Sequence, residues 1–149
     1  MGFALEFVQD NRSKSTKNVL RGLHFQKTKP QGKLVSVTQG AVFDVAVDLR
    51  PESLTFGQHH SVILSEENFL QFYIPPGFAH GFCVLSDTAS FQYKCTDYYD
   101  PTDESGLIWN DPDLGIEWPV SHPVVSAKDC FLPSLASIKE QILKGWKNV

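Results

Sequence analysis

The sequence predicts an all-β fold, an antiparallel sandwich or barrel with one short helix at the end. From Leu5 to about Asp97, short segments rich in β-branched and aromatic residues recur between Gly, Pro and Asn residues, at the spacing typical of such folds. The 149 residues are a usual length for one domain, so we expect residues 1–149 to form a single domain. A hydrophobic fraction of 42%, with 11 Phe, indicates one packed core and excludes a disordered chain.

Eight segments carry the strand pattern, and the fourth shows it most clearly. Between Ala41 and Leu49, one face of the expected strand is wholly apolar while the other carries Asp44 and Asp48, which predicts a half-buried strand. The short links at residues 38–41 and 86–87 predict hairpins, and therefore antiparallel pairing. The expected strands are Leu5–Gln9, Val19–Gln26, Lys33–Thr38, Ala41–Leu49, His59–Leu64, Phe69–Ile74, Ala79–Leu85 and Ala89–Asp97.

The chain changes character beyond Asp100. Pro, Asp and Gly punctuate this part, with Trp109 and Trp118 embedded in it, which predicts a long ordered loop wrapping the sheet rather than further strands. A helical spacing of apolar residues returns after Pro133 and predicts a short C-terminal helix packed outside the barrel. Its apolar positions are Leu135, Ile138, Ile142 and Trp146.

Charge and cysteine content limit the partners and the compartment. A net charge of −4 gives no electrostatic basis for nucleic-acid binding, so an anionic ligand has to be held by local groups. The three cysteines are odd in number and lack the spacing of a zinc site, which favours a reducing cytosol. No apolar run approaches the ~20 residues of a membrane span, and the first residues lack the apolar core of a signal peptide. We expect a cytoplasmic protein without membrane partners.

Two polar residues interrupt the otherwise apolar segment Val19–Gln26. Strict alternation along a strand places Arg21 and His24 on opposite faces. Both can reach one cavity only if Gly22 forms a bulge. The alternative is that His24 is a hydrogen-bonded histidine of the core.

Lys33 and Tyr93 each share a strand face with apolar residues. Lys33 lies with Val35 and Val37, so it either extends to solvent at the strand end or supplies a cation inside the barrel. Tyr93 alternates in phase with apolar neighbours, and we expect its ring to point inward. Its hydroxyl is either a hydrogen-bonded core group or, in a wide barrel, a proton donor.

One short motif raises the question of a metal. Pro76–His80 fits the P-G-x-x-H pattern of the second motif of cupin barrels, whose His is a ligand in the members that bind metal. The first cupin motif needs an HxH pair followed by Glu, because a divalent ion takes three or four converging ligands. His24 has no partner two positions on, and the adjacent His59 and His60 point to opposite strand faces, so we expect no metal. Asp129 is a turn or cap residue unless the chain folds back toward His24.

Eight segments together form the pattern of one enzyme family. They are Val19–Gln26, Gln31–Val35, Phe43–Arg50, Ile74–Phe82, Tyr98–Tyr99, Trp109–Pro112, Gly115–Pro119 and Ser126–Asp129. In this order and at this spacing they closely resemble the dTDP-4-dehydrorhamnose 3,5-epimerases, and the likeness runs from Phe7 to about Pro133. The resemblance implies a cupin or jelly-roll barrel. It also implies epimerisation at carbons 3 and 5 of dTDP-4-dehydro-6-deoxyglucose, in dTDP-rhamnose biosynthesis.

The resemblance implies a role for each matching residue, and it implies no cofactor. The general base falls on His24, with Asp129 as its carboxylate partner. The proton donor falls on Tyr93, and the cation beside the sugar keto oxygen falls on Lys33. The family also implies a homodimer. Contacts to the diphosphate and nucleoside of the substrate fall on Arg21, His80, Gln9, Asn11, Glu104 and Lys128.

The chain departs from the family pattern at its start. The family's early segment with an Arg-Gly-x-Phe motif, which contacts the nucleotide and builds the dimer, is missing, so we expect either a truncated form or a different mode of binding and pairing. Two alternatives stay open: a related enzyme of 4-keto-sugar nucleotides that epimerises one carbon or moves the keto group, and a non-catalytic cupin that binds a sugar nucleotide. The absent HxH motif disfavours a metal-dependent cupin oxygenase.

Overall fold

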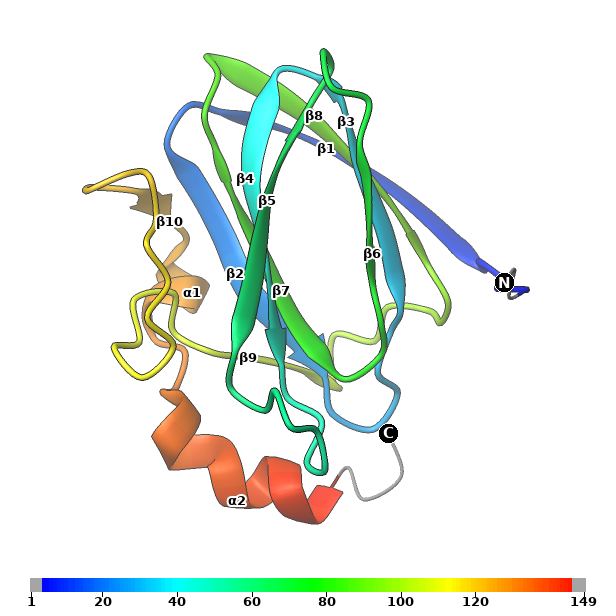
Figure 1. The fold of residues 1–149 in the computed structure, drawn as a ribbon, viewed down its shortest axis with the longest axis vertical. Coiled ribbons are helices and arrows are strands. Elements are labelled where there is room, and N and C mark those ends of the chain that lie inside the picture. The colour runs from blue at the N-terminus through cyan, green and yellow to red at the C-terminus, as the bar shows by residue number, and fades with distance from the viewer. Residues whose placement is uncertain (1–3, 146–149) are drawn as a thin grey trace.

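The computed structural model describes residues 4–145 as two β-sheets packed face to face, with two short helices after them (Figure 1). One sheet has the strand order β1-β8-β3-β6, and the other has the order β10-β2-β7-β4-β5, with β9 paired to β2. The strands are β1 (Gln9–Thr16), β2 (Val19–Gln26), β3 (Lys33–Gln39), β4 (Ala41–Asp48), β5 (His59–Ser65), β6 (Gln71–Ile74), β7 (Phe78–Val84), β8 (Thr88–Cys95), β9 (Glu104–Gly106) and β10 (Val124–Val125). The helices are α1 (Ala127–Cys130) and α2 (Leu135–Gly145).

Successive strands alternate between the two sheets. Among the described strands from β1 to β8, β4 and β5 are the only consecutive pair that lie side by side, and every other link crosses from one sheet to the other. The strands pair antiparallel, apart from β10, which runs parallel to β2. This arrangement is a double-sheet jelly roll, which confirms the predicted all-β fold class.

Both predicted hairpins are wrong. The link at residues 38–41 carries the chain from β3 in one sheet to β4 in the other, and the link at residues 86–87 joins β7 to β8 in the same way. Gly40 has a φ of +76°, and a Cβ atom there would lie 2.1 Å from the carbonyl oxygen of Thr88. Glycine therefore permits a tight corner between the sheets. A corner and a hairpin give the same local turn signal, so the sequence pattern could not distinguish them.

Two apolar cores lie on opposite faces of the sheet that contains β4. The inner core fills the space between the sheets and includes Val42 and Phe91. The outer core includes Val45 and lies under α2, which contributes Leu135 and Ile142. Strand β4 is therefore covered on both faces, and the prediction of a half-buried strand is wrong. Burying each such side chain contributes roughly 1.5–3 kcal/mol, so covering the second face stabilises the sheet substantially.

Three strands lie where the pattern did not predict them. Strand β1 covers Gln9–Thr16 instead of Leu5–Gln9, because both of its faces are polar and apolar periodicity does not mark it. Strands β9 and β10 lie in the segment expected to be a loop. They have three and two residues, which is too short for any alternation to be visible.

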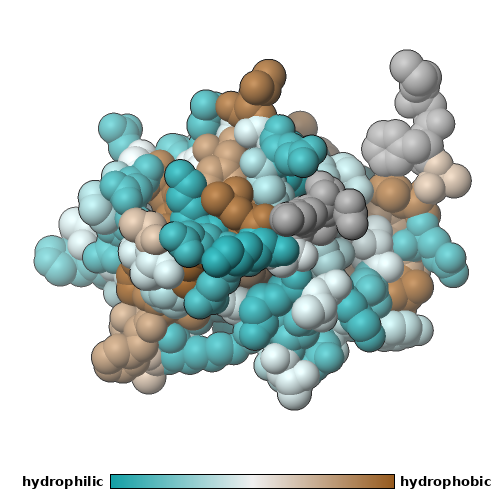
Figure 2. Space-filling model, turned by 90° about the horizontal axis from the view of Figure 1, so that it is seen from below, coloured by the Kyte–Doolittle hydropathy of each residue, from teal (hydrophilic) through white to brown (hydrophobic). Residues whose placement is uncertain are grey.

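The C-terminal helix is confirmed and packs on the outer core. The backbone N–H of Leu135 donates to Oδ2 of Asp111 at 2.6 Å, which satisfies one free donor of the first turn of α2. Of the predicted apolar positions, Trp146 lies outside the described residues. Seen from below, the side where α2 lies in Figure 1, the surface is mostly hydrophilic with separate apolar patches (Figure 2). Among residues 4–145, no helix is long and apolar enough to span a bilayer.

Candidate active site

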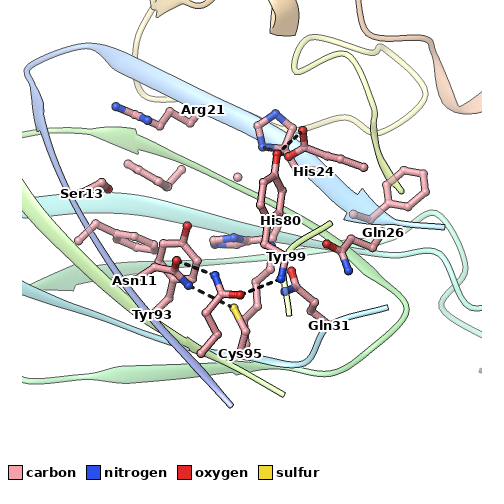
Figure 3. Close-up of a pocket in the computed structure, with 17 residues that line it drawn as sticks. Asn11, Ser13, Arg21, His24, Gln26, Gln31, His80, Tyr93, Cys95 and Tyr99 are labelled. Carbon is pink, nitrogen blue, oxygen red and sulfur yellow. Dashed lines mark hydrogen bonds and ion pairs between the residues drawn. The ribbon is translucent and has the colours of Figure 1, made fainter. Parts of the chain in front are cut away.

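A pocket of about 410 Å³ lies between the two sheets and receives side chains from both (Figure 3). Strands β2 and β7 line it from one sheet, and β1, β3 and β8 line it from the other. Tyr99, which precedes β9, and Glu104, the first residue of β9, also line the pocket. Most of the residues around the pocket are polar, although it occupies the inside of the barrel.

The polar strand β1 forms one wall of the pocket. Gln9, Asn11 and Ser13 line the cavity, while the alternate residues of the strand are exposed to solvent. The amide of Gln9 donates to Oδ1 of Asn11 at 2.8 Å, and the Asn11 amide lies 3.7 Å from Sγ of Cys95. A strand with water on one face and a polar cavity on the other needs no apolar residues, which explains its composition.

A bulge at Gly22 brings Arg21 and His24 to the same pocket. The register between β2 and β7 shifts between Arg21 and His24, and both side chains line the cavity. Gly22 has a φ of +120°, and a Cβ atom there would lie 2.6 Å from Cα of Gly81. Only glycine fits this position, because a side chain would meet both an unfavourable backbone conformation and the neighbouring strand. The bulge that Arg21 and His24 need in order to reach one cavity is therefore present.

His24 and Asp129 form a hydrogen-bonded pair. Nε2 of His24 lies 2.7 Å from Oδ1 of Asp129, and Oδ2 of the same carboxylate accepts from the backbone N–H of Gly22 at 3.1 Å. Ser126 caps α1 by accepting from the Asp129 N–H, which fixes the helix that carries the carboxylate. Burial raises the pKa of Asp129, but the interactions with His24 and Gly22 outweigh it, and the pKa lies below its usual value. The ionised carboxylate orients the imidazole so that Nδ1 remains available in the pocket.

Lys33 and Tyr93 face the pocket from the other sheet. Lys33 begins β3 and Tyr93 lies on β8, and no residue among those described forms a hydrogen bond with either side chain. Burial lowers the pKa of Lys33, although electrostatic attraction to the ionised forms of Cys95, Asp44 and Glu104 acts in the opposite direction. Burial is also the main cause that raises the pKa of Tyr93, which keeps its phenol protonated at neutral pH. Each of these side chains thus presents to the pocket a polar group without a hydrogen-bond partner among the described residues, and this group is available to a ligand.

The six predicted contacts to the nucleotide lie around the same site. Five of them line the pocket, and the sixth, Lys128, does not, but its ammonium donates to Oε2 of Glu104, which does. The guanidinium of Arg21 also donates to Oγ of Ser15 at 3.1 Å, which directs it along β1. The five that line the pocket are Gln9, Asn11, Arg21, His80 and Glu104.

A second histidine–carboxylate pair, which sequence reasoning missed, lies beneath the pocket. Nε2 of His80 is 3.0 Å from both carboxylate oxygens of Asp44, and both residues are buried. The ring of His80 stacks on Phe91, with 5.9 Å between centroids. The signal was present in the sequence, since Asp44 stands among apolar residues on the inner face of β4. A buried carboxylate needs a partner, and His80 provides it.

Within the described part of the chain, no group of three or more His, Cys, Asp or Glu side chains is arranged to hold a metal ion. Cys83, Cys95 and Cys130 are free thiols. The pocket presents an imidazole at His24 and a phenol at Tyr93, which are groups suited to acid–base chemistry, and an amine at Lys33, which is suited to stabilising a negative charge.

Comparison with known proteins shows what this chain is similar to. The family model described as dTDP-4-dehydrorhamnose 3,5-epimerase matches residues 1–137. A dTDP-4-dehydrorhamnose 3,5-epimerase of Salmonella typhimurium (strain LT2) is 58% identical over 137 residues, which cover 91% of this chain and 75% of that protein. Its counterpart in Methanothermobacter thermautotrophicus is 56% identical over 131 residues, which cover 86% of this chain and 71% of that protein.

A solved structure matches the fold as closely. It is the dTDP-6-deoxy-D-glucose-3,5-epimerase of Legionella pneumophila Philadelphia 1 in complex with dTDP-4-keto-L-rhamnose. It superposes on this chain with a TM-score of 0.91 at 55% identity, and the match covers 95% of this chain and 76% of that one.

Proposed function

The chain belongs to the dTDP-4-dehydrorhamnose 3,5-epimerase family, and from this premise we propose how its pocket inverts two carbons of a sugar nucleotide. The protein is an isomerase that converts dTDP-4-dehydro-6-deoxyglucose to dTDP-4-dehydrorhamnose by epimerisation at carbons 3 and 5, in rhamnose biosynthesis. One observation carries the mechanism. The His24–Asp129 pair lies on one side of the pocket, and the side chains of Lys33 and Tyr93 face it from the opposite sheet.

The first step is removal of a proton beside the keto group. The 4-keto group acidifies the hydrogens on carbons 3 and 5, because the electron pair left behind is delocalised onto the keto oxygen as an enolate. Nδ1 of His24 accepts this proton, since Nε2 is already bonded to Asp129 at 2.7 Å. The Asp129 carboxylate then stabilises the imidazolium that forms. Lys33 stabilises the negative charge on the enolate oxygen.

The second step is return of a proton to the opposite face. A single base tends to return a proton to the face from which it came, so inversion needs a donor on the other side. Tyr93 supplies it, because β8 belongs to the sheet facing the one that carries His24. The phenol gives its proton to carbon, and the enolate collapses to the ketone. Each acid–base group of this kind contributes typically ~100- to 10,000-fold in rate.

The remaining polar residues bind the nucleotide. Arg21 and His80 supply groups suited to a diphosphate, and Gln9 and Asn11 supply amides suited to hydrogen bonding with the nucleoside. Lys128 completes this set as a cation for phosphate, and Glu104, to which Lys128 donates, lies beside His24.

Hydrogen exchange tests this mechanism directly. Incubation of dTDP-4-dehydro-6-deoxyglucose with the protein in D2O, followed by NMR, should show deuterium at carbons 3 and 5 together with formation of the epimer. His24→Asn should lower exchange at both carbons at least ~100-fold while binding of dTDP is retained, because the imidazole acts on the sugar. His122→Asn is the matched control, since His122 is exposed and lies outside the pocket. Full exchange by the His24 variant would remove it as the base.

We also propose that the enzyme is a homodimer in a reducing, cytoplasmic compartment. The outer edge of β1 is supporting evidence for the dimer, because β1 pairs only with β8 among the described strands and unpaired sheet edges are commonly covered by a partner. The three free thiols support a reducing compartment.

A further inference from the structure

Glu104 connects the catalytic histidine to an exposed cation. Its Oε2 atom accepts hydrogen bonds from the hydroxyl of Tyr99, at 3.2 Å, and from the ammonium of Lys128. Its Oε1 atom lies 3.9 Å from Nδ1 of His24, and no donor among residues 4–145 forms a hydrogen bond with it. One oxygen is thus held in place, while the other lies on the side of the imidazole that receives the substrate proton.

A carboxylate at this place is unfavourable for a diphosphate, because both groups are anionic. In the free protein Lys128 compensates this charge, and its hydrogen bond with Glu104 raises the pKa of Lys128. The Lys128 side chain is 62% exposed, whereas that of Glu104 is 11% exposed. The long, solvated lysine is therefore the partner that can move. A diphosphate offers this ammonium more negative charge than one carboxylate does.

We propose that Glu104 is a positioning residue for His24: Lys128 holds it in the free enzyme, and the substrate's diphosphate releases it by drawing Lys128 away. Once released, Glu104 directs its charge to Nδ1 and stabilises the imidazolium that forms during proton removal, while Tyr99 still holds Oε2. This inference rests on the proposed function, and it adds that nucleotide binding precedes full activation of the base. The base reaches full strength only after the nucleotide has bound.

Other charged groups around His24 do not change in this way. Asp129 of α1 is bonded to the imidazole directly, and it is buried away from an arriving anion. The Glu104–Lys128 pair, contributed by β9 and α1, carries the charge that a diphosphate redistributes. The other titratable or charged groups around the pocket are Arg21 of β2, Lys33 of β3, His80 of β7, Tyr93 and Cys95 of β8, and Tyr99 before β9.

The test separates binding from turnover. Glu104→Gln should lower kcat about 10-fold, as loss of an outer partner of a catalytic histidine does. Its Kd for dTDP should be unchanged or lower than that of the wild type, because Lys128 no longer has to leave a carboxylate. The acidic limb of the pH profile should move to lower pH, since a nearby carboxylate favours the imidazolium. This movement should be larger for kcat, which reports the substrate complex, than for kcat/KM, which reports the free enzyme.

Lys128→Met should have the opposite effect, in that it changes binding rather than turnover. It should weaken dTDP binding about 10-fold, as expected for losing one charge-assisted contact to phosphate, with kcat at saturation within about twofold of the wild type. The matched controls are Glu140→Gln and Lys144→Met, because this exposed ion pair of α2 lies outside the pocket. Both controls should keep wild-type values of Kd and kcat.

Three results would overturn the inference. A loss of dTDP affinity in Glu104→Gln with unchanged kcat would make Glu104 a nucleotide contact only. Equal movement of the acidic limbs of kcat and kcat/KM would mean that Glu104 acts on His24 without any release by substrate. Wild-type kinetics in Glu104→Gln would remove its role. Absence of epimerisation by the wild-type enzyme in the same assay would instead contradict the proposed function, so the two failures are distinguishable.

Discussion

The substitution Tyr93→Phe removes a single hydroxyl group, and it can therefore separate the removal of a proton from its return. Tyr93→Phe keeps the ring and its packing, so the fold should be nearly unaffected. His24 can still remove a proton, and Lys33 can still stabilise the enolate. The variant should therefore exchange substrate hydrogen for deuterium but return it mainly to the original face, which gives labelled substrate with little epimer. Label and epimer are measured together in one NMR time course.

The matched control for this experiment is Tyr98→Phe, because Tyr98 is exposed and does not line the pocket. It should give the wild-type ratio of epimer to exchange. If Tyr93 were only a core residue, its variant would keep that ratio as well. Its stability should also stay close to that of the wild type, because the removed hydroxyl forms no hydrogen bond with any described residue.

Individual site residues differ in how far the sequence could predict them. Alternation within one strand, which is a local property, predicted the inward direction of Tyr93, but for Lys33 it left open whether the side chain extends to solvent or into the barrel. The pairing of His24 with Asp129 depends on the chain folding back over 105 residues, and no spacing rule contains that information. Only the resemblance to the family supplied it. Asp44 was visible as an acidic residue that alternates with Val42 and Ala46, but its partner lies on another strand, β7.

The bulge in strand β2 requires a glycine at position 22, and the position of His24 in the pocket requires the bulge. Gly22→Ala should destabilise the protein by roughly 2–4 kcal/mol, because the new Cβ would lie 2.6 Å from Gly81 and the backbone has a positive φ. Epimerase activity should fall as well, since the bulge directs His24 into the pocket. Urea denaturation measures the first effect, and the exchange assay measures the second.

Gly145→Ala is the corresponding control, because a Cβ at this end of α2 would meet no atom of the described residues within 4 Å. It should change stability by no more than about 0.5 kcal/mol. Wild-type stability and activity of Gly22→Ala would mean that β2 does not need the bulge.

At the level of elements, the sequence predicted the strands that bury apolar residues better than those that do not. Strand β2 has the predicted bounds, and β3, β4, β5, β7 and β8 are close to them. Strand β1 was misplaced because its inner face is the polar wall of the pocket. The hairpins were wrong because β3 and β4 belong to different sheets, and which strands pair is a property of the whole barrel. The glycine corner at residue 40 is compatible with either outcome.

For the molecule as a whole, the proposed homodimer has a direct test. Sedimentation equilibrium should give twice the chain mass of 16.7 kDa at the concentrations used for the exchange assay. The physical reason is the outer edge of β1, whose backbone groups have no second strand beside them among the described residues. A fully active monomer at those concentrations would contradict the proposal.

The crossing of nearly every link between the two sheets has a consequence for how the enzyme comes into being. Strands that pair with distant partners must close long loops before any contact stabilises them, and such topologies fold slowly. The His24–Asp129 pair, which we propose to be catalytic, joins positions 24 and 129, so it cannot form while the nascent chain is shorter than 129 residues. The histidine proposed as the base therefore gains its carboxylate partner late in synthesis, after the residues of every described strand have been made.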